Sequence, residues 1–115
     1  MASIAEVSKI TILTKTAYAE IGTKLQRRGQ ETVVRHLPVP FAHGTMVSVE
    51  DLFYNVPARL KFLKSAQTEF YYCYAYFLDV AIVHFDKDFV LMKNNNLVFD
   101  LKANETVEGR ILDLF

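Results

Sequence analysis

The segment from residue 43 to residue 70 constrains the fold most, because its periodicity changes several times and each change has a local cause. Gly44 can adopt backbone conformations that are closed to residues with a Cβ, and the valine-rich residues 45–50 favour an extended strand. Pro57 has no N–H to donate, so it fits the first turn of a helix, which Asn55 is placed to cap. The segment therefore predicts a strand, a loop and a helix, in that order.

The helix that starts at Pro57 is predicted to be amphipathic and basic. Its apolar stripe consists of Leu60, Phe62 and Leu63. Its cationic side chains are Arg59, Lys61 and Lys64. From the residues alone, these cations, with Arg27 and Arg28 in an earlier turn, are expected to form a solvated basic face. Arg59 is also expected to have a defined structural partner, either a carboxylate or a helix terminus.

The rest of the chain shows the periodic apolar patterns of further strands and helices, separated by turn residues. The strands are expected at residues 9–16, 18–27, 32–37, 45–50, 89–92 and 97–101. Further helices are expected at residues 68–85 and 104–115, and the end of another at residues 4–8. Gly22 is expected to mark a bulge or a close approach of backbone, and residues 94–96 a hairpin turn. The pattern predicts an α+β fold: a mostly antiparallel sheet with helices packed on one face.

The expected helix at residues 68–85 is apolar on nearly every side, with Thr68 as its N-cap and Glu69 in its first turn. A helix of this kind is normally buried on several sides or covered by a partner, and its tyrosine hydroxyls can reach water at an interface edge. Cys73 is expected to be a small core residue. The alternative is an uncovered apolar patch, through which we expect the chain to self-associate.

Composition narrows the functional classes. The 13 basic and 13 acidic residues balance, so the charge of the whole chain does not predict nucleic-acid binding. A single cysteine excludes an internal disulfide and favours a reducing compartment. The most apolar run, residues 70–83, is too short to cross a bilayer. The three histidines (His36, His43 and His84) lack metal-ligand spacing.

One family resemblance rests on a long series of fixed positions. The series reads Gly44-Thr45-x-Val-x-Val-x-Asp-Leu-Phe-Tyr-Asn-x-Pro-Ala-Arg-x-Lys-Phe-Leu-Lys, and Thr68-Glu69-Phe70 follows it. It resembles the third conserved block of the MutL family of DNA mismatch repair proteins. Residues 2–8 resemble the segment that follows the Gly-Phe-Arg-Gly-Glu-Ala-Leu block of that family. The resemblance implies the C-terminal half of an ATPase domain at residues 1–103, of a fold shared with gyrase B, Hsp90 and histidine kinases, and the start of a transducer domain at residues 104–115.

The resemblance also implies a nucleotide contact. In related ATPases the threonine of the Gly-Thr pair lies on the adenine side of the pocket, so Gly44 and Thr45 are the candidate nucleotide-binding residues. On local sequence alone, Gly44 could simply make a turn and Thr45 start a strand. The cofactors implied for the parent protein are ATP and Mg²⁺. The family's catalytic glutamate, its magnesium-binding asparagine and its glycine-rich lid are not in this sequence, so we expect the chain alone to bind no cofactor tightly and to lack ATPase activity.

At the level of the parent protein, the resemblance implies coupling of ATP binding and hydrolysis to dimerisation and to recruitment of downstream repair factors. The implied partners are a second MutL-type subunit, the mismatch recognition protein MutS and DNA, with no membrane. For DNA, the resemblance implies a possible contact at Arg59, Lys61 and Lys64, with Arg27 and Arg28, and a solvated basic face is the alternative. The implied location is the cytoplasm, at the nucleoid in a bacterium, or the nucleus in a eukaryote. One rival is a stand-alone interaction module without ATPase activity. Another is a topoisomerase subunit of the same fold, which the Asn55-x-Pro-Ala-Arg59 signature disfavours.

Overall fold

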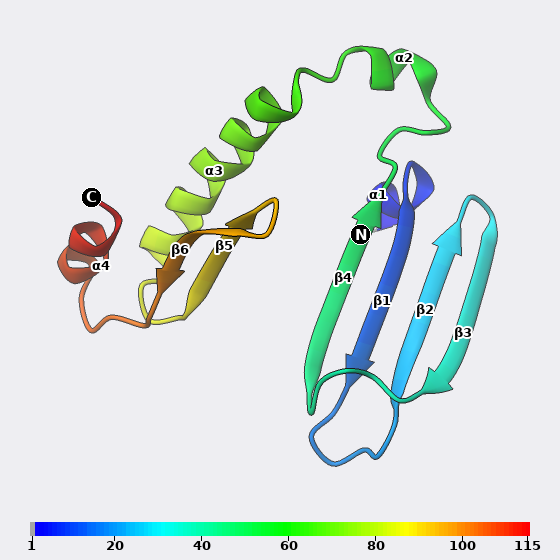
Figure 1. The fold of residues 1–115 in the computed structure, drawn as a ribbon, viewed down its shortest axis with the longest axis horizontal. Coiled ribbons are helices and arrows are strands. Elements are labelled where there is room, and N and C mark those ends of the chain that lie inside the picture. The colour runs from blue at the N-terminus through cyan, green and yellow to red at the C-terminus, as the bar shows by residue number, and fades with distance from the viewer. Residues whose placement is uncertain (1) are drawn as a thin grey trace. The chain divides into compact units, whose positions relative to one another are not determined.

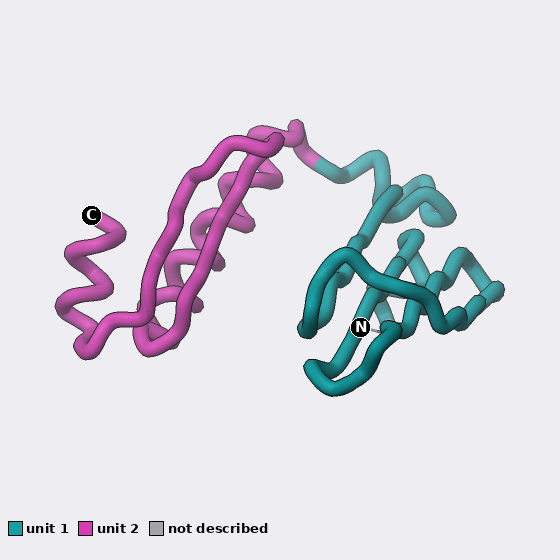
Figure 2. Tube along the Cα trace, turned by 60° about the horizontal axis from the view of Figure 1, so that its bottom comes forward, with its two compact units in different colours: residues 1–63 teal, residues 64–115 magenta. Residues whose placement is uncertain are grey.

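The computed structural model describes residues 2–115, which form two compact units: a first unit that ends at Leu63 and a second unit that begins at Lys64 (Figure 2). The first unit contains α1 (Ala2–Glu6), β1 (Lys9–Lys15), β2 (Gly22–Arg28), β3 (Glu31–Leu37), β4 (Gly44–Glu50) and α2 (Pro57–Lys61) (Figure 1). The second unit contains α3 (Ala66–Val83), β5 (Phe89–Lys93), β6 (Asn96–Leu101) and α4 (Val107–Leu114). The expected α+β class is confirmed, and the six strands are divided between two antiparallel sheets, one in each unit.

The first unit is a four-stranded antiparallel sheet in the order β3-β2-β1-β4. Because residues directly opposite each other in neighbouring strands share a face, the register puts one apolar set on a single face. This apolar face consists of Ile10, Ile12, Leu25, Val34, Val47 and Val49. Ile10 is only 3% exposed, whereas Val34 is 54% exposed and Val47 47%. Most of the apolar face is therefore open within this unit.

Gly22 marks a close approach of backbone, as expected, and not a bulge. A Cβ at Gly22 would lie 2.7 Å from the carbonyl oxygen of Thr14 and 2.7 Å from Cγ1 of Val39. The pairing on both sides of β2 runs without a register shift. The strand also begins four residues later than expected, because the Ala19 N–H donates to the Thr16 carbonyl and closes a turn before it.

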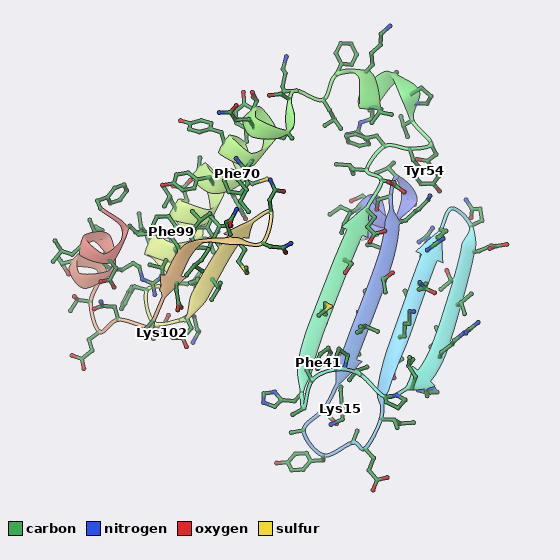
Figure 3. The ribbon with its side chains drawn as sticks, viewed as in Figure 1. Lys15, Phe41, Tyr54, Phe70, Phe99 and Lys102 are labelled. Atoms are coloured by element: carbon green, nitrogen blue, oxygen red, sulfur yellow. The ribbon has the colours of Figure 1, made fainter. Side chains whose placement is uncertain are left out.

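The second unit has a compact aromatic core between α3 and the β5–β6 hairpin, where Phe70 and Phe99 are labelled in Figure 3. Phe99 of β6 stacks on two rings of α3, with centroids 5.9 Å from Tyr74 and 6.0 Å from Phe77. The hairpin turns at Asn94 and Asn95, both with positive φ, which confirms the expected turn. The buried centre of the core consists of Ala81, Leu101 and Leu114.

Two expectations for α3 are wrong. The N-cap is Ser65, whose hydroxyl accepts the Thr68 N–H at 3.2 Å, because the helix already begins at Ala66. Glu69 does lie in the first turn, where its carboxylate accepts the Lys64 N–H at 2.9 Å. Cys73 is exposed, because only one side of α3 packs on the hairpin and Cys73 lies on another. No helix within residues 2–115 is both long and apolar enough to span a bilayer.

A buried arginine attaches α4 to the rest of the second unit. The Arg110 side chain is fully buried, and its guanidinium donates to the carbonyls of Ala81 at 3.0 Å, Phe85 at 2.9 Å, Lys87 at 2.6 Å and Lys102 at 3.2 Å. A cation at the carbonyl end of α3 is favoured by the helix dipole. One side chain thus connects the end of α3, the segment before β5 and the end of β6 to α4.

Candidate functional site

The Gly44-Thr45 pair opens β4 on the first unit's sheet. Gly44 has a φ of +118°, in the region that residues with a Cβ rarely adopt. No atom lies within 4 Å of the place where its Cβ would be, so the backbone conformation, and not lack of space, favours glycine here. Lys15 Nζ donates to the Ala42 carbonyl at 2.6 Å and so holds the segment before Gly44 to the end of β1. Figure 3 shows Lys15 near Phe41 at this end of the sheet.

The hydroxyl of Thr45 is held by a second threonine. Thr14 of β1 lies directly opposite Thr45, and the two Oγ1 atoms are 2.8 Å apart. The Thr14 hydroxyl also lies 3.3 Å from the Gly44 carbonyl, to which it can donate. Sequence reasoning did not identify Thr14, because it is 31 residues from Thr45 and a threonine in a strand is common. Only the strand register brings the two hydroxyls together.

These threonines belong to a polar row that crosses the whole sheet. The row consists, in strand order from β4 to β3, of Thr45, Thr14, Thr23 and His36. Thr23 Oγ1 lies 3.2 Å from His36 Nδ1, so the row contains two hydrogen-bonded pairs. It shares a face with the apolar set that contains Ile12 and Val47, because those residues lie two positions along each strand. The open apolar face is thus bordered by a line of three hydroxyl groups and one imidazole.

The motif between Asp51 and Arg59 contacts the end of α1 and the residues that follow it. The Asn55 side-chain amide donates to the Glu6 carbonyl at 2.9 Å, and the Phe53 N–H donates to the Val7 carbonyl at 2.6 Å. Asp51 forms an ion pair with Lys9 at 3.1 Å. We call these contacts the motif clamp. The expected cap at Asn55 is therefore wrong, since the N-cap of α2 is Val56 without a side-chain hydrogen bond.

Pro57 lies in the first turn of α2, as expected. The guanidinium of Arg59 lies over the ring of Phe53, 4.6 Å from the centroid, where it gains a cation–π contact. Within residues 2–115 no ion pair involves Arg59, so the expected carboxylate partner is not found there. Phe53 has a φ of +65°, a costly conformation for an aromatic residue, and this turn directs its ring under the guanidinium.

The other basic residues of the predicted patch differ in their local surroundings. Lys61 and Lys64 are exposed. Arg27 and Arg28 are consecutive in β2 and so point to opposite faces of the sheet. The apolar stripe expected on α2 is also not buried: the helix ends at Lys61, and Phe62 beyond it is 80% exposed.

Comparison with known proteins gives one consistent result. The DNA mismatch repair protein MutL of Porphyromonas gingivalis is 41% identical over 115 residues, which is 100% of this chain and 18% of that protein. MutL of Coxiella burnetii is 37% identical over 112 residues, 96% of this chain and 19% of that protein. The solved MutL ATPase domain of Aquifex aeolicus, complexed with ADP, superposes with a TM-score of 0.89 at 27% identity. The chain belongs to the MutL family of DNA mismatch repair proteins.

The extent of these matches defines which part of a MutL protein the chain resembles. The chain spans about a fifth of the length of the curated MutL relatives. The superposition with the Aquifex aeolicus MutL ATPase domain includes 99% of this chain and 47% of that chain. The N-terminal domain of a DNA repair protein, at 22% identity and a TM-score of 0.77, shares the fold. No protein-family model matches the sequence. The expected membership of the MutL family and its ATPase-domain fold are confirmed.

Proposed function

We propose that this chain supplies the adenine side of the ATP-binding site in a MutL-type mismatch repair ATPase, through Gly44 and Thr45. The observation that supports the proposal is the Thr45 hydroxyl, held by Thr14 at 2.8 Å beside a left-handed Gly44. The solved Aquifex aeolicus relative, which has the same fold over 99% of this chain, is a complex with ADP.

The chemistry of the pair suits a nucleotide base. A threonine hydroxyl can bond to one neighbour and accept from another, so Thr45 can accept from an amino group on a purine edge while it is bonded to Thr14. Gly44 presents no side chain at the entrance to β4, so its backbone stays open to a flat ring. The open apolar face next to the row, which contains Val47 and Ile12, offers the apolar surroundings that nucleotide pockets have.

ATP and Mg²⁺ are the cofactors that the proposal assigns to the parent protein, where ATP supplies a γ-phosphate for hydrolysis. Within residues 2–115, no three His, Cys, Asp or Glu side chains gather in the way that a metal site requires. The proposal therefore gives this chain the adenine contact and no Mg²⁺ ligand. We expect that the chain by itself does not hydrolyse ATP.

For the parent protein we propose the coupling of ATP binding and hydrolysis to dimerisation and to recruitment of downstream repair factors, with a second MutL-type subunit, MutS and DNA as partners. Residues 1–103 would belong to the ATPase domain and residues 104–115 to the start of the transducer domain. Exposed Lys61 and Lys64 are the better candidates for a DNA contact. Arg59 is the weaker candidate, because its guanidinium is engaged by Phe53.

A chimeric protein tests the adenine contact. In it, this chain replaces the segment of Porphyromonas gingivalis MutL that it matches over all 115 residues. Loss of one hydrogen bond to the base predicts about tenfold weaker ATP binding for Thr45→Val. Thr45→Ser keeps the hydroxyl and should bind like the unaltered chimera. Equal affinity of Thr45→Val and the unaltered chimera, measured by calorimetry, would contradict the proposal.

A further inference from the structure

We propose that Thr14 is a positioning residue that makes the Thr45 hydroxyl a hydrogen-bond acceptor toward the base, and thereby favours a 6-amino purine over a 6-oxo purine. The inference rests on the proposed function, since it assumes that Thr45 meets the C6 substituent of the base. It adds Thr14, which lies outside the Gly44-Thr45 motif, to the residues that determine nucleotide choice.

The two threonine protons limit which hydrogen bonds can form at the same time. Each hydroxyl has one proton to donate, whereas the Gly44 carbonyl can only accept. When Thr14 donates to the Gly44 carbonyl at 3.3 Å, Thr45 can donate its own proton to Thr14 at 2.8 Å. Both protons are then used. When Thr14 donates to Thr45 instead, the Gly44 carbonyl loses this partner and only one of the two bonds is made. The first arrangement is favoured by the additional bond.

With its proton directed at Thr14, the Thr45 oxygen retains a lone pair for a ligand and has no donor to offer it. Adenine carries an amino group on C6, which donates. Hypoxanthine, the base of inosine, carries an oxygen on C6, which accepts. The Thr45 oxygen can accept a hydrogen bond from the amino group. It cannot bond to the oxo group, because both oxygens are then acceptors and repel each other. Thr14 thus favours ATP over inosine triphosphate (ITP).

The sheet provides a matched control for Thr14. Thr23 is the next residue in the polar row, directly opposite Thr14 on the far side from Thr45. Its hydroxyl bonds to His36 at 3.2 Å and not to Thr45. Thr23→Val makes the same chemical change as Thr14→Val, one strand farther from the candidate site. Any general effect of replacing a threonine hydroxyl in this row should appear in both variants.

The test measures the affinities of ATP and ITP for the chimera with Porphyromonas gingivalis MutL. Loss of the hydrogen bond that orients Thr45 should reduce the ratio of ATP to ITP affinity about tenfold in Thr14→Val. Thr14→Ser retains the hydroxyl and should restore the ratio, and Thr23→Val should leave it unchanged. If the role of Thr14 were purely structural, Thr14→Val would weaken the binding of ATP and of ITP by the same factor. An unchanged ratio in Thr14→Val would overturn the inference.

Thr45→Val separates this inference from the proposed function. If Thr45→Val leaves ATP affinity unchanged, the proposed function fails and the inference fails with it. If Thr45→Val weakens ATP binding and Thr14→Val keeps the ratio, the inference alone fails.

A second measurement uses the 115-residue chain without nucleotide. The three-bond couplings of the Thr45 methyl carbon to its own N and C′ report the side-chain rotamer. We expect one rotamer in the unaltered chain, in Thr14→Ser and in Thr23→Val, and an average of several rotamers in Thr14→Val. Identical couplings in all four proteins would overturn the positioning role.

Discussion

The two units of this chain bury their apolar side chains to different degrees. In the second unit Leu101 is 3% exposed and Ala81 is fully buried, and Phe77 and Phe99 pack around them. In the first unit the apolar face is largely open, with Val34 and Val47 about half exposed. The polar row with the candidate nucleotide contact borders this open face, and the buried Arg110 lies in the closed unit. The second unit thus buries an apolar core among its own residues, whereas the first unit exposes an apolar surface.

Removal of the Arg110 side chain should have the largest effect on the second unit. Arg110→Met removes all four hydrogen bonds of the guanidinium, although the Phe85 carbonyl keeps the Asn104 N–H as a donor, so we expect a loss of roughly 4 kcal/mol in the free energy of unfolding. Hydrogen exchange of the backbone amides of α3 measures this loss of stability within the second unit. Arg35→Met, at an exposed position of β3, is the control and should change the free energy of unfolding by less than about 0.5 kcal/mol. Equal exchange in both variants would show that the hydrogen bonds of Arg110 are dispensable.

A pair of alanine substitutions should sharpen the contrast between the units. Leu101→Ala removes a buried side chain and should cost roughly 3 kcal/mol. Val47→Ala removes a half-exposed one and should cost less, about 1 kcal/mol. Unit-specific hydrogen exchange measures both losses. A greater loss for Val47→Ala would mean that the sheet face is better covered than the structure shows.

The motif clamp predicts a smaller and more local effect. Asn55→Ala removes one hydrogen bond to the Glu6 carbonyl and should cost about 1 kcal/mol. In Asn55→Ala, amide hydrogen exchange should become faster at residues 6–9, and α2 should show no selective increase. Gln30→Ala, in the exposed β2–β3 turn, is the control. Selective fraying of α2 would instead support the capping role that the sequence alone suggested.

The open apolar face should promote self-association with little effect on folding. Val34→Lys places a charge on that face, and we expect a smaller associated fraction in sedimentation experiments. Val33→Lys is a close control, because Val33 is the preceding residue of β3, is similarly exposed and points to the opposite face. Equal association of the two variants would contradict association through the apolar face.

The sequence predicted the features that depend on near neighbours. Strand alternation, the Asn94–Asn95 turn and the start of α2 at Pro57 are of this kind. The cap of α3 was misplaced because Ser65 and Thr68 both suit an N-cap and lie only three residues apart.

Contacts between distant residues could not be predicted in the same way. Asn55 contacts a carbonyl 49 residues away, Thr14 a hydroxyl 31 residues away, and Arg110 carbonyls up to 29 residues away. Each depends on strand register or on helix docking, which no local pattern specifies. The family resemblance identified Thr45 as a candidate, and the register added the residue that holds it.

The most direct measurement of the central claim is a crystal structure of the Porphyromonas gingivalis chimera with ADP. The account predicts that the Thr45 hydroxyl, still bonded to Thr14, lies within hydrogen-bond distance of the adenine, directly or through one water. An adenine bound without Thr45, with its base directed to another part of the protein, would contradict it.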